Sequence, residues 1–193
     1  MVLAHPDPDS FCAAACAQAV SALARTGHEV TVIDLYAEQF NPSMTSAERL
    51  AYETDQPILD PQVQRYADLV KSSEGLVFVY PTWWFGLPAM LKGFLDRVLV
   101  PGVSFVLDPA TNKVKPGLNH VRHIVGITTY GSTPTAMLLF NDAGRRIIVR
   151  GVRLLAPLMR CRRTWLGLHR MDNNSPADRS AFLLKIDRVM GAL

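Results

Sequence analysis

Three consecutive aromatic residues stand where this sequence could hold a flat, conjugated ligand. Trp83, Trp84 and Phe85 follow the apolar run 75–80 and lie between two prolines. The apolar run has the length and composition of a buried parallel strand, and the turn after such a strand is where open α/β sheets bind ligands. The pattern therefore predicts an aromatic ligand turn. The alternative is a loop whose aromatic side chains fill the core.

Two other segments have the polar groups that such a ligand would need. Segment 4–11 runs into the start of a helix, where free backbone N–H groups and the positive end of the dipole favour anions. His5 and Ser10 can add donors to a phosphate, although Ser10 could simply cap the helix and His5 could be structural. Two aspartates in this segment count against an anion unless they point away. Segment 128–132 is polar and ends a strand, and Gly131 lets a ligand approach the backbone closely.

A phosphate turn, an aromatic turn and a polar glycine turn along one sheet edge together fit a flavin. The phosphate would lie at the first turn and the isoalloxazine ring between the other two. The first turn has no G-x-G-x-x-G motif, which argues against a Rossmann-type dinucleotide site. The sequence therefore predicts a flavin site built from three turns.

Strand and helix patterns alternate along the chain and place these turns. Runs rich in β-branched and apolar residues predict five strands: Met1–Ala4, Glu29–Asp34, Leu76–Tyr80, His123–Thr129 and Arg163–His169. Apolar periodicity and capping residues predict the helices: Ser10–Arg25, Ser46–Glu53, Asp60–Ser72, Leu87–Leu99, Asp142–Leu158 and a last helix from about Pro176 to Met190. Val103–Leu107 and Asn112–Val114 are expected to form an excursion from the sheet. Pro134 is expected to interrupt any helix directly after the fourth strand.

This alternation predicts an α/β fold with a doubly wound, five-stranded parallel sheet and helices on both faces. Right-handed crossovers give the strand order 2-1-3-4-5. In that order the carboxyl ends of the first, third and fourth strands are neighbours. No repeat, low-complexity tract or linker divides the chain, so residues 1–193 are expected to form a single domain.

Composition excludes several classes of protein. Apolar residues make up 49% of the chain, yet no uninterrupted apolar run is long enough to cross a bilayer, and no signal-type segment opens the sequence. Cys12, Cys16 and Cys161 lack the spacing of a metal site and are expected to be small buried hydrophobes, with a redox pair at positions 12 and 16 as the alternative. These features predict a cytoplasmic protein without a bound metal. Because the first strand opens abruptly at Met1, we expect a few native residues to precede it.

The net charge of +3 comes from a local surplus. Between Arg145 and Arg170 the chain has eight arginines and no acidic residue. Such a run suits a phosphate-rich partner, such as the 2′-phosphate of NADPH, an acidic protein or an anionic membrane, and the alternative is a solvated helix face. Nucleic acid is not an expected partner, because no recognised binding motif accompanies the charge.

The residues at these turns also match a known pattern. The matching pieces are Leu3-Ala4-His5-Pro6 with Ser10-Phe11, Asp34-Leu35-Tyr36 with Phe40-Asn41-Pro42, Pro81 through Asp96, Thr128-Thr129 with Gly131-Ser132, and Pro176-Ala177-Asp178. They span nearly the whole chain, and the stretch from Trp84 to Gly93 is highly specific. On these residues the chain resembles the NAD(P)H:quinone oxidoreductase (DT-diaphorase-like) family of flavodoxin-like flavoproteins.

The resemblance implies a flavodoxin-like domain that binds FAD, with FMN as the alternative, and that uses NAD(P)H as co-substrate. The residues expected to contact the flavin phosphates are His5, Ser10 and Phe11. Those expected to line the ring and the ribityl chain are Pro81, Thr82, Trp83, Trp84 and Phe85. Those expected at the pyrimidine side of the ring are Thr129, Tyr130 and Gly131.

The resemblance further implies a homodimer that passes hydride from NAD(P)H through the flavin to a quinone-like acceptor in a ping-pong sequence. The family's Tyr/His pair after the polar glycine turn is missing, because Tyr130 replaces a glycine and residues 133–144 contain neither type. The flavin would then carry the chemistry, and Tyr130 is the one candidate for a catalytic side chain. Two alternatives stay open. One is a flavin-binding regulatory subunit of a membrane transporter such as a potassium efflux system, motivated by the basic stretch Arg145–Arg163, and the other is an electron carrier.

Overall fold

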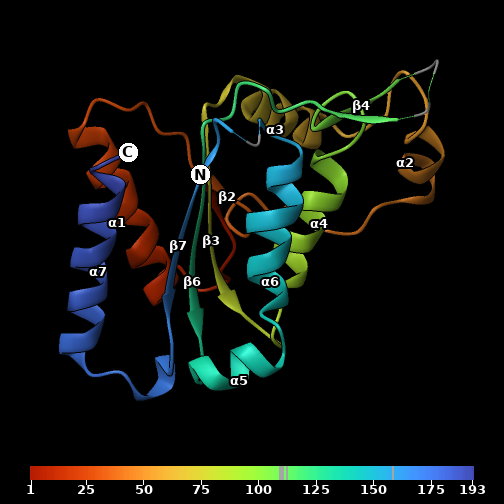
Figure 1. Cartoon of the computed structure of the whole chain (residues 1–193). Helices are drawn as coiled ribbons and strands as arrows, with labels where there is room; N and C mark the ends of the chain where they lie inside the picture. Colours follow the sequence, from red (N-terminus) through yellow and green to blue (C-terminus); the bar gives the residue numbers. More distant parts are fainter. Residues whose placement is uncertain (109–110, 112, 158) are drawn as a thin grey trace.

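Five parallel strands form one sheet at the centre of the protein (Figure 1). The computed structural model describes residues 1–108, 111, 113–157 and 159–193. The strands of this sheet are β1 (Val2–Leu3), β2 (Ile33–Asp34), β3 (Gly75–Thr82), β6 (His123–Tyr130) and β7 (Arg162–Leu168). They lie in the order β2-β1-β3-β6-β7 and pair in parallel, which confirms the predicted order 2-1-3-4-5.

Helices cover both faces of this sheet (Figure 1). On one face α1 (Phe11–Arg25) and α7 (Pro176–Met190) pack against each other. The other face is covered by α3 (Pro61–Ser72), by α4 (Ala89–Val98) and by α6 (Ala143–Arg146), which continues as a π-helix over residues 147–152. The predicted doubly wound architecture is confirmed.

Two apolar cores follow from the alternation of side chains along the strands. In β3, Val77 and Val79 pack in the core beneath α1 and α7, whereas Phe78 and Tyr80 pack in the core beneath the helices of the opposite face. Helices on both faces therefore explain why the run 75–80 is almost wholly apolar.

The two strands at the start of the chain are shorter than predicted. The prediction Glu29–Asp34 holds only for Ile33–Asp34, and Met1–Ala4 only for Val2–Leu3. β2 is an edge strand, and its single neighbour β1 pairs with it over only these positions, so residues before Ile33 have no ladder to join. The other three predicted strands are found, with their ends shifted by at most two residues.

The segment after β6 departs most from the sequence prediction. Pro134 does not interrupt a helix but occupies the first turn of α5 (Pro134–Leu139). Thr133 caps α5 by accepting a hydrogen bond from the N–H of Ala136 at 3.2 Å. Proline suits the first turn because a backbone N–H would have no helical partner there.

The helix predicted at Asp142–Leu158 also differs from the structure. Asn141 and Asp142 have positive φ angles of 66° and 38°, and Asp142 caps the short helix α6. The chain then enters the π-helix, whose i→i+5 bonding replaces the expected regular α-helix. Leu158 lies outside the described residues.

A two-stranded antiparallel hairpin forms the predicted excursion from the main sheet. β4 (Phe105–Leu107) lies within the predicted segment Val103–Leu107 and pairs with β5 (Val114–Pro116). The second predicted segment, 112–114, overlaps β5 only at Val114, and Asn112 lies outside the described residues.

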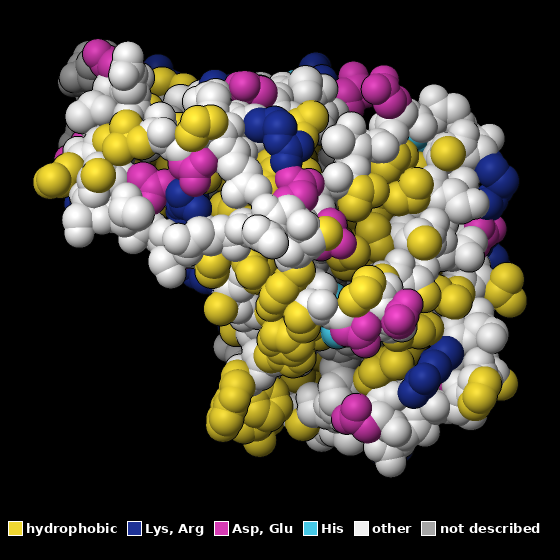
Figure 2. Space-filling view, turned by 180° about the vertical axis from the view of Figure 1, so that it is seen from behind, with side chains coloured by type: hydrophobic (Ala, Val, Ile, Leu, Met, Phe, Trp, Pro, Cys, Tyr) yellow, Lys and Arg dark blue, Asp and Glu magenta, His cyan; other side chains and the backbone are white. Residues whose placement is uncertain are grey.

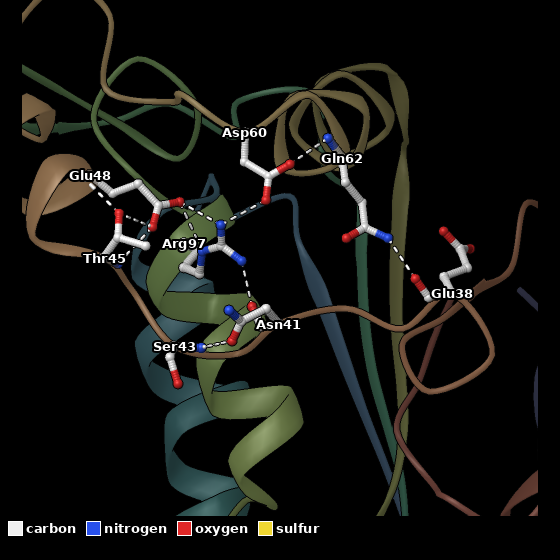
Figure 3. Close-up of polar contacts among 8 residues, drawn as sticks. All are labelled: Glu38, Asn41, Ser43, Thr45, Glu48, Asp60, Gln62 and Arg97. Atoms are coloured by element: carbon white, nitrogen blue, oxygen red, sulfur yellow. Dashed lines mark hydrogen bonds and ion pairs between the residues drawn. The ribbon is translucent and has the colours of Figure 1, made fainter.

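A buried guanidinium ties the long connection between β2 and α3 to α4 (Figure 3). Arg97 of α4 is 5% exposed and donates to Glu48 through Nε at 2.9 Å and to Asp60 through Nη2 at 2.8 Å. Its Nη1 donates to the carbonyl oxygen of Asn41, and its Nη2 also bonds Glu48. Glu48 belongs to α2 (Ser46–Ala51), and Asp60 caps α3. One side chain therefore fixes two helices against a third.

The carboxylates of this cluster are held in their ionised form. Burial opposes ionisation of Glu48, but hydrogen bonds from Thr45 and Arg97 outweigh it and lower the pKa of Glu48. Burial likewise opposes ionisation of Asp60, and bonds from Arg97 and the α3 backbone lower its pKa. Such groups stabilise the fold above their unfolded-state pKa, and the contribution is lost as pH falls through the depressed folded-state pKa.

We expect Arg97→Ala to lower the free energy of unfolding by about 3–5 kcal/mol at neutral pH, because it leaves two carboxylates without their cation. Urea unfolding followed by circular dichroism measures this loss. Arg49→Ala is the control, because Arg49 forms only an exposed ion pair with Glu53. Its loss should lower the free energy of unfolding by about 0.5 kcal/mol or less. The deficit of Arg97→Ala should shrink below about pH 4, where the carboxylates protonate. Equal losses in the two variants would contradict this account.

Candidate functional site

Three turns meet at the carboxyl edge of the sheet because β1, β3 and β6 are parallel neighbours. Their side chains make contact from turn to turn. The rings of His5 and Trp83 have their centroids 6.1 Å apart, which joins the first turn to the second. Thr82 Oγ1 and Thr128 Oγ1 lie 2.9 Å apart, which joins the second to the third. The three turns therefore form one continuous edge.

The first turn presents unused donors at the start of α1. Ser10 caps this helix by accepting from the N–H of Ala13 at 3.2 Å. The N–H groups of Phe11 and Cys12 have no hydrogen-bond partner among the described residues. Two free N–H groups at the positive end of a fifteen-residue helix form a site for an anion.

The other polar groups of the first turn are compatible with that anion. His5 Nδ1 lies 3.1 Å from the backbone N of Asp7 and 3.2 Å from its carbonyl oxygen, so Nδ1 is engaged within the turn and Nε2 is the ring nitrogen left for a ligand. Asp7 Oδ1 accepts from the N–H of Asp9 at 2.9 Å, so this carboxylate is engaged within the turn.

The aromatic turn is exposed and held in an unusual backbone conformation. Trp84 is 96% exposed and Trp83 is 43% exposed. Trp84 and Phe85 have φ angles of 49° and 60°, a region that residues other than glycine seldom adopt. Phe85 stacks on Phe140, with ring centroids 3.8 Å apart and 19° between the ring planes. Exposed aromatics in such a conformation are typical of a binding surface.

An apolar patch surrounds the aromatic turn. Figure 2 shows hydrophobic side chains gathered at the lower left, the end of the molecule where Figure 1 has α5 and the turn after β3. Leu138 and Leu139 of α5 are 80% and 81% exposed, and Phe140 is 51% exposed. Exposed apolar surface of this kind marks a place where a ligand or another protein binds.

The Tyr130 side chain packs behind this edge. Its ring stacks on His169 with centroids 4.3 Å apart, its hydroxyl donates to Asp142 Oδ2 at 2.9 Å, and it accepts from Trp165 Nε1 at 3.1 Å. Burial, together with the negative charge of Asp142, raises the pKa of the hydroxyl well above its usual value. The tyrosine is thus a neutral, fully bonded group within the fold.

The third turn still offers backbone donors. Thr129 is buried, with its Oγ1 lying 3.7 Å from Cys12 Sγ. Beyond Tyr130, the N–H groups of Gly131 and Ser132 form no hydrogen bond within the described part of the chain. Together with the N–H groups of Phe11 and Cys12, they place unpaired backbone donors on both sides of the aromatic turn.

Thiol chemistry is disfavoured near this edge. All three cysteines are buried and unpaired, as predicted for small buried hydrophobes. Burial raises the pKa of Cys12 and of Cys16 to about 11, so neither thiol ionises near neutral pH. In the part of the chain that the structure describes, no group of three or more His, Cys, Asp or Glu side chains could hold a metal ion. None of the described helices has the length and apolar character needed to cross a membrane.

The predicted site residues fall into two groups by their exposure. Those exposed or partly exposed are His5, Ser10, Phe11, Thr82, Trp83, Trp84, Phe85 and Gly131. Those buried within the fold are Pro81, Thr129 and Tyr130. The buried group would contact a ligand mainly through its backbone.

The side chains that support the turns were not predicted from the sequence. Phe140 supports Phe85, and Asp142 together with His169 holds Tyr130. The contacts with Phe140 and His169 join segments far apart in the sequence, so no local pattern singles them out. The donor at Ser132 was also missed, although its place beside Gly131 was a usable signal.

Comparison with known proteins agrees with this architecture. The model of the family described as having a flavodoxin-like fold matches residues 1–149. Over 147 residues the chain is 33% identical to NAD(P)H dehydrogenase (quinone) 1 of Rattus norvegicus, covering 68% of this chain and 53% of that protein. Over 107 residues it is 38% identical to the uncharacterized NAD(P)H oxidoreductase YcaK of Escherichia coli (strain K12), covering 54% of each.

Solved structures show the same fold over the whole chain. Smu.1420 from Streptococcus mutans UA159 superimposes with a TM-score of 0.83 at 26% identity, covering 100% of this chain and 97% of that one. An NAD(P)H:quinone oxidoreductase from Methanothermobacter marburgensis gives 0.81 at 23% identity, covering 98% and 95%, which is a likeness of fold. The chain therefore belongs to the family with a flavodoxin-like fold. It spans about half the length of the curated relatives that it matches.

We expect Tyr130→Phe to lower the free energy of unfolding by about 1–3 kcal/mol, because Asp142 and Trp165 lose a buried hydrogen-bond partner. Urea unfolding measures the loss. Tyr36→Phe is the control, since the Tyr36 hydroxyl makes no hydrogen bond with any described residue and its removal should change stability by about 0.5 kcal/mol or less. A stable Tyr130→Phe variant with abolished enzymatic turnover would instead make Tyr130 catalytic.

Proposed function

We propose that this protein is a flavin-dependent oxidoreductase that takes hydride from NAD(P)H and passes it to a quinone-like acceptor. The observation that carries the proposal is the exposed aromatic turn at Trp84, which lies between two sets of unused backbone donors. The names of its curated relatives, NAD(P)H dehydrogenase (quinone) 1 and an NAD(P)H oxidoreductase, support the same class of reaction. The flavin would be FAD, or FMN as the alternative.

The groups available at the edge suit a flavin in size and polarity. A flavin has a phosphate at one end and a flat ring with an electron-poor pyrimidine edge at the other. The N–H groups of Phe11 and Cys12, with His5 Nε2, would hold the phosphate. The N–H groups of Gly131 and Ser132 would face the pyrimidine edge.

The protein contributes position and electrostatics, and a bound flavin would supply the chemistry of accepting and releasing a hydride. Phe85, fixed by its stack on Phe140, would give the ring a rigid neighbour, and the exposed Trp84 would offer a second stacking surface. The free N–H groups at Gly131 and Ser132 are oriented before any ligand binds, so they can stabilise negative charge without reorganisation.

No side-chain acid is assigned to the reaction. The hydroxyl of Tyr130 is committed to Asp142 and Trp165, and its raised pKa makes it a poor proton donor. The donor and the acceptor would use the same exposed surface in turn, which gives a ping-pong sequence. The exposed apolar side chains of Leu139 and Phe140, at the end of α5, suit a homodimer whose partner copy would pack beside the ligand surface.

A visible absorbance spectrum tests this function directly. We expect the purified protein to show a flavin spectrum that bleaches when NADPH is added without oxygen and returns when menadione follows. A flavin that neither NADPH nor NADH reduces would favour the regulatory or electron-carrier role. A protein that binds neither FAD nor FMN after reconstitution would contradict the proposal.

We expect the double substitution Trp84→Ala/Phe85→Ala to weaken flavin binding by about tenfold or more, because ring stacking contributes roughly 1–3 kcal/mol per aromatic contact. Flavin content after gel filtration, and fluorescence titration of the apoprotein, measure this effect. Leu50→Ala is the control, since Leu50 is an exposed apolar residue of α2, outside the three turns. Unchanged flavin affinity in the double variant would show that the aromatic turn does not bind the flavin.

A further inference from the structure

A basic pocket lies between α5, the α6–π-helix segment and the edge strand β7. Its volume is about 460 Å³, within the range of small-molecule sites. Its charged lining consists of Arg145, Arg146, Arg150, Arg163 and Asp142. Its remaining walls are Pro134, Met137, Leu138, Asn141, Val149 and His169. The pocket therefore combines four guanidinium groups with an apolar wall.

These four arginines lack the carboxylate partners that other arginines of the chain have. Arg25, Arg49, Arg65 and Arg97 each form an ion pair with an Asp or Glu. Within the described part of the chain, the guanidinium groups of the four pocket arginines form no ion pair and no hydrogen bond. Neighbouring like charges repel, so an anion entering the pocket would relieve that repulsion.

The single acidic residue of the pocket is already engaged. Asp142 Oδ2 accepts from the Tyr130 hydroxyl at 2.9 Å, and Oδ1 accepts from the N–H of Arg145 at 3.3 Å. Its negative charge therefore points into the fold, where it holds Tyr130 and caps α6. Four guanidinium groups against one committed carboxylate leave the pocket strongly positive.

The pocket adjoins the aromatic turn. Phe140, at the end of α5, stacks on Phe85 of that turn. Gly144 of α6 also lies against it, since a Cβ at Gly144 would be 3.3 Å from the backbone carbon of Gly86. Neither Phe140 nor Gly144 lines the pocket, so the pocket and the aromatic turn are neighbours on either side of α5 and the start of α6.

We propose that this pocket binds the adenosine 2′-phosphate of NADPH and makes the protein prefer NADPH to NADH. This inference rests on the proposed function, because it assigns the far end of the hydride donor whose nicotinamide would reach the aromatic turn. A phosphate monoester carries close to two negative charges at neutral pH, and guanidinium groups bind it through paired N–H donors. The apolar wall formed by Pro134, Met137 and Leu138 would receive the adenine.

The test is calorimetric titration of the purified protein with 2′,5′-ADP and with 5′-AMP, which lacks the 2′-phosphate. We expect 2′,5′-ADP to bind and 5′-AMP to bind at least about tenfold more weakly, as expected for losing a charge-assisted contact. In Arg150→Ala/Arg163→Ala this difference should disappear, along with the preference for NADPH over NADH in kcat/KM. Both arginines are exposed, so the variant should keep the fold, which circular dichroism verifies.

Arg162→Ala is the matched control. Arg162 is also exposed and neighbours Arg163 in β7, but it does not line the pocket, because successive strand residues point to opposite faces. It should retain both the 2′,5′-ADP affinity and the NADPH preference. Equal losses in Arg162→Ala and in the pocket variant would overturn the proposal, since they would indicate a general effect of charge.

The remaining outcomes separate this proposal from the proposed function. Inorganic phosphate that competes as strongly as 2′,5′-ADP, together with equal use of NADPH and NADH, would overturn the NADPH assignment while leaving the oxidoreductase intact. Failure of both nucleotides to reduce the flavin would overturn the proposed function. The titration with 2′,5′-ADP needs no flavin reduction, so it tests nucleotide binding in the pocket independently of the proposed function.

Discussion

The parallel pairing of β3 with β6 is the constraint on which the functional edge depends. The strands pair along their whole length and end together at Thr82 and Tyr130, so the aromatic turn and the polar turn leave the sheet side by side. Because side chains alternate, a shift of one residue would separate Thr128 from Thr82 and turn Tyr130 to the α1 face. Gly126 constrains the pairing of β6 with β7 in the same way, since the ring of Trp165 in β7 lies where any Cβ at Gly126 would be. A residue larger than glycine would push β7 away from β6.

The same register determines how α5 and α6 are placed. The Tyr130 ring lies against Gly167 of β7, where a Cβ would come within 2.7 Å of it, and the Tyr130 hydroxyl reaches Asp142 at the start of α6. Just before Asp142, Phe140 stacks on Phe85. One hydrogen bond and one stacking contact therefore join the strand, the helices and the aromatic turn. The basic pocket is a consequence of this arrangement, because Arg145, Arg146 and Arg150 follow Asp142 along the chain while Arg163 faces them from β7.

Local sequence signals predicted the framework well. The apolar run 75–80 forms β3 and Asp60 caps α3, and both signals act through neighbouring residues; Ser10 caps α1, which was the alternative to its predicted contact with a phosphate. The prediction for the α5–π-helix region was wrong for two physical reasons. Pro134 was read as a helix breaker although proline also starts helices, and apolar periodicity does not distinguish i→i+4 from i→i+5 bonding. The supports of the site, such as Phe140, depend on contacts between distant segments, which no local pattern encodes.

Arginine has two opposite uses in this chain, and only the structure separates them. Arg97 is enclosed by Glu48 and Asp60, so its donors are committed during folding and serve to fix helices. Arg150 and Arg163 remain exposed and keep their donors for a ligand. A count of charges treats these three arginines alike. Grouping cations without carboxylates costs stability through repulsion, and a bound anion would offset that cost. An unpaired cluster beside the aromatic turn is therefore better explained by a phosphate-bearing ligand than by solubility, which dispersed charges would serve equally well.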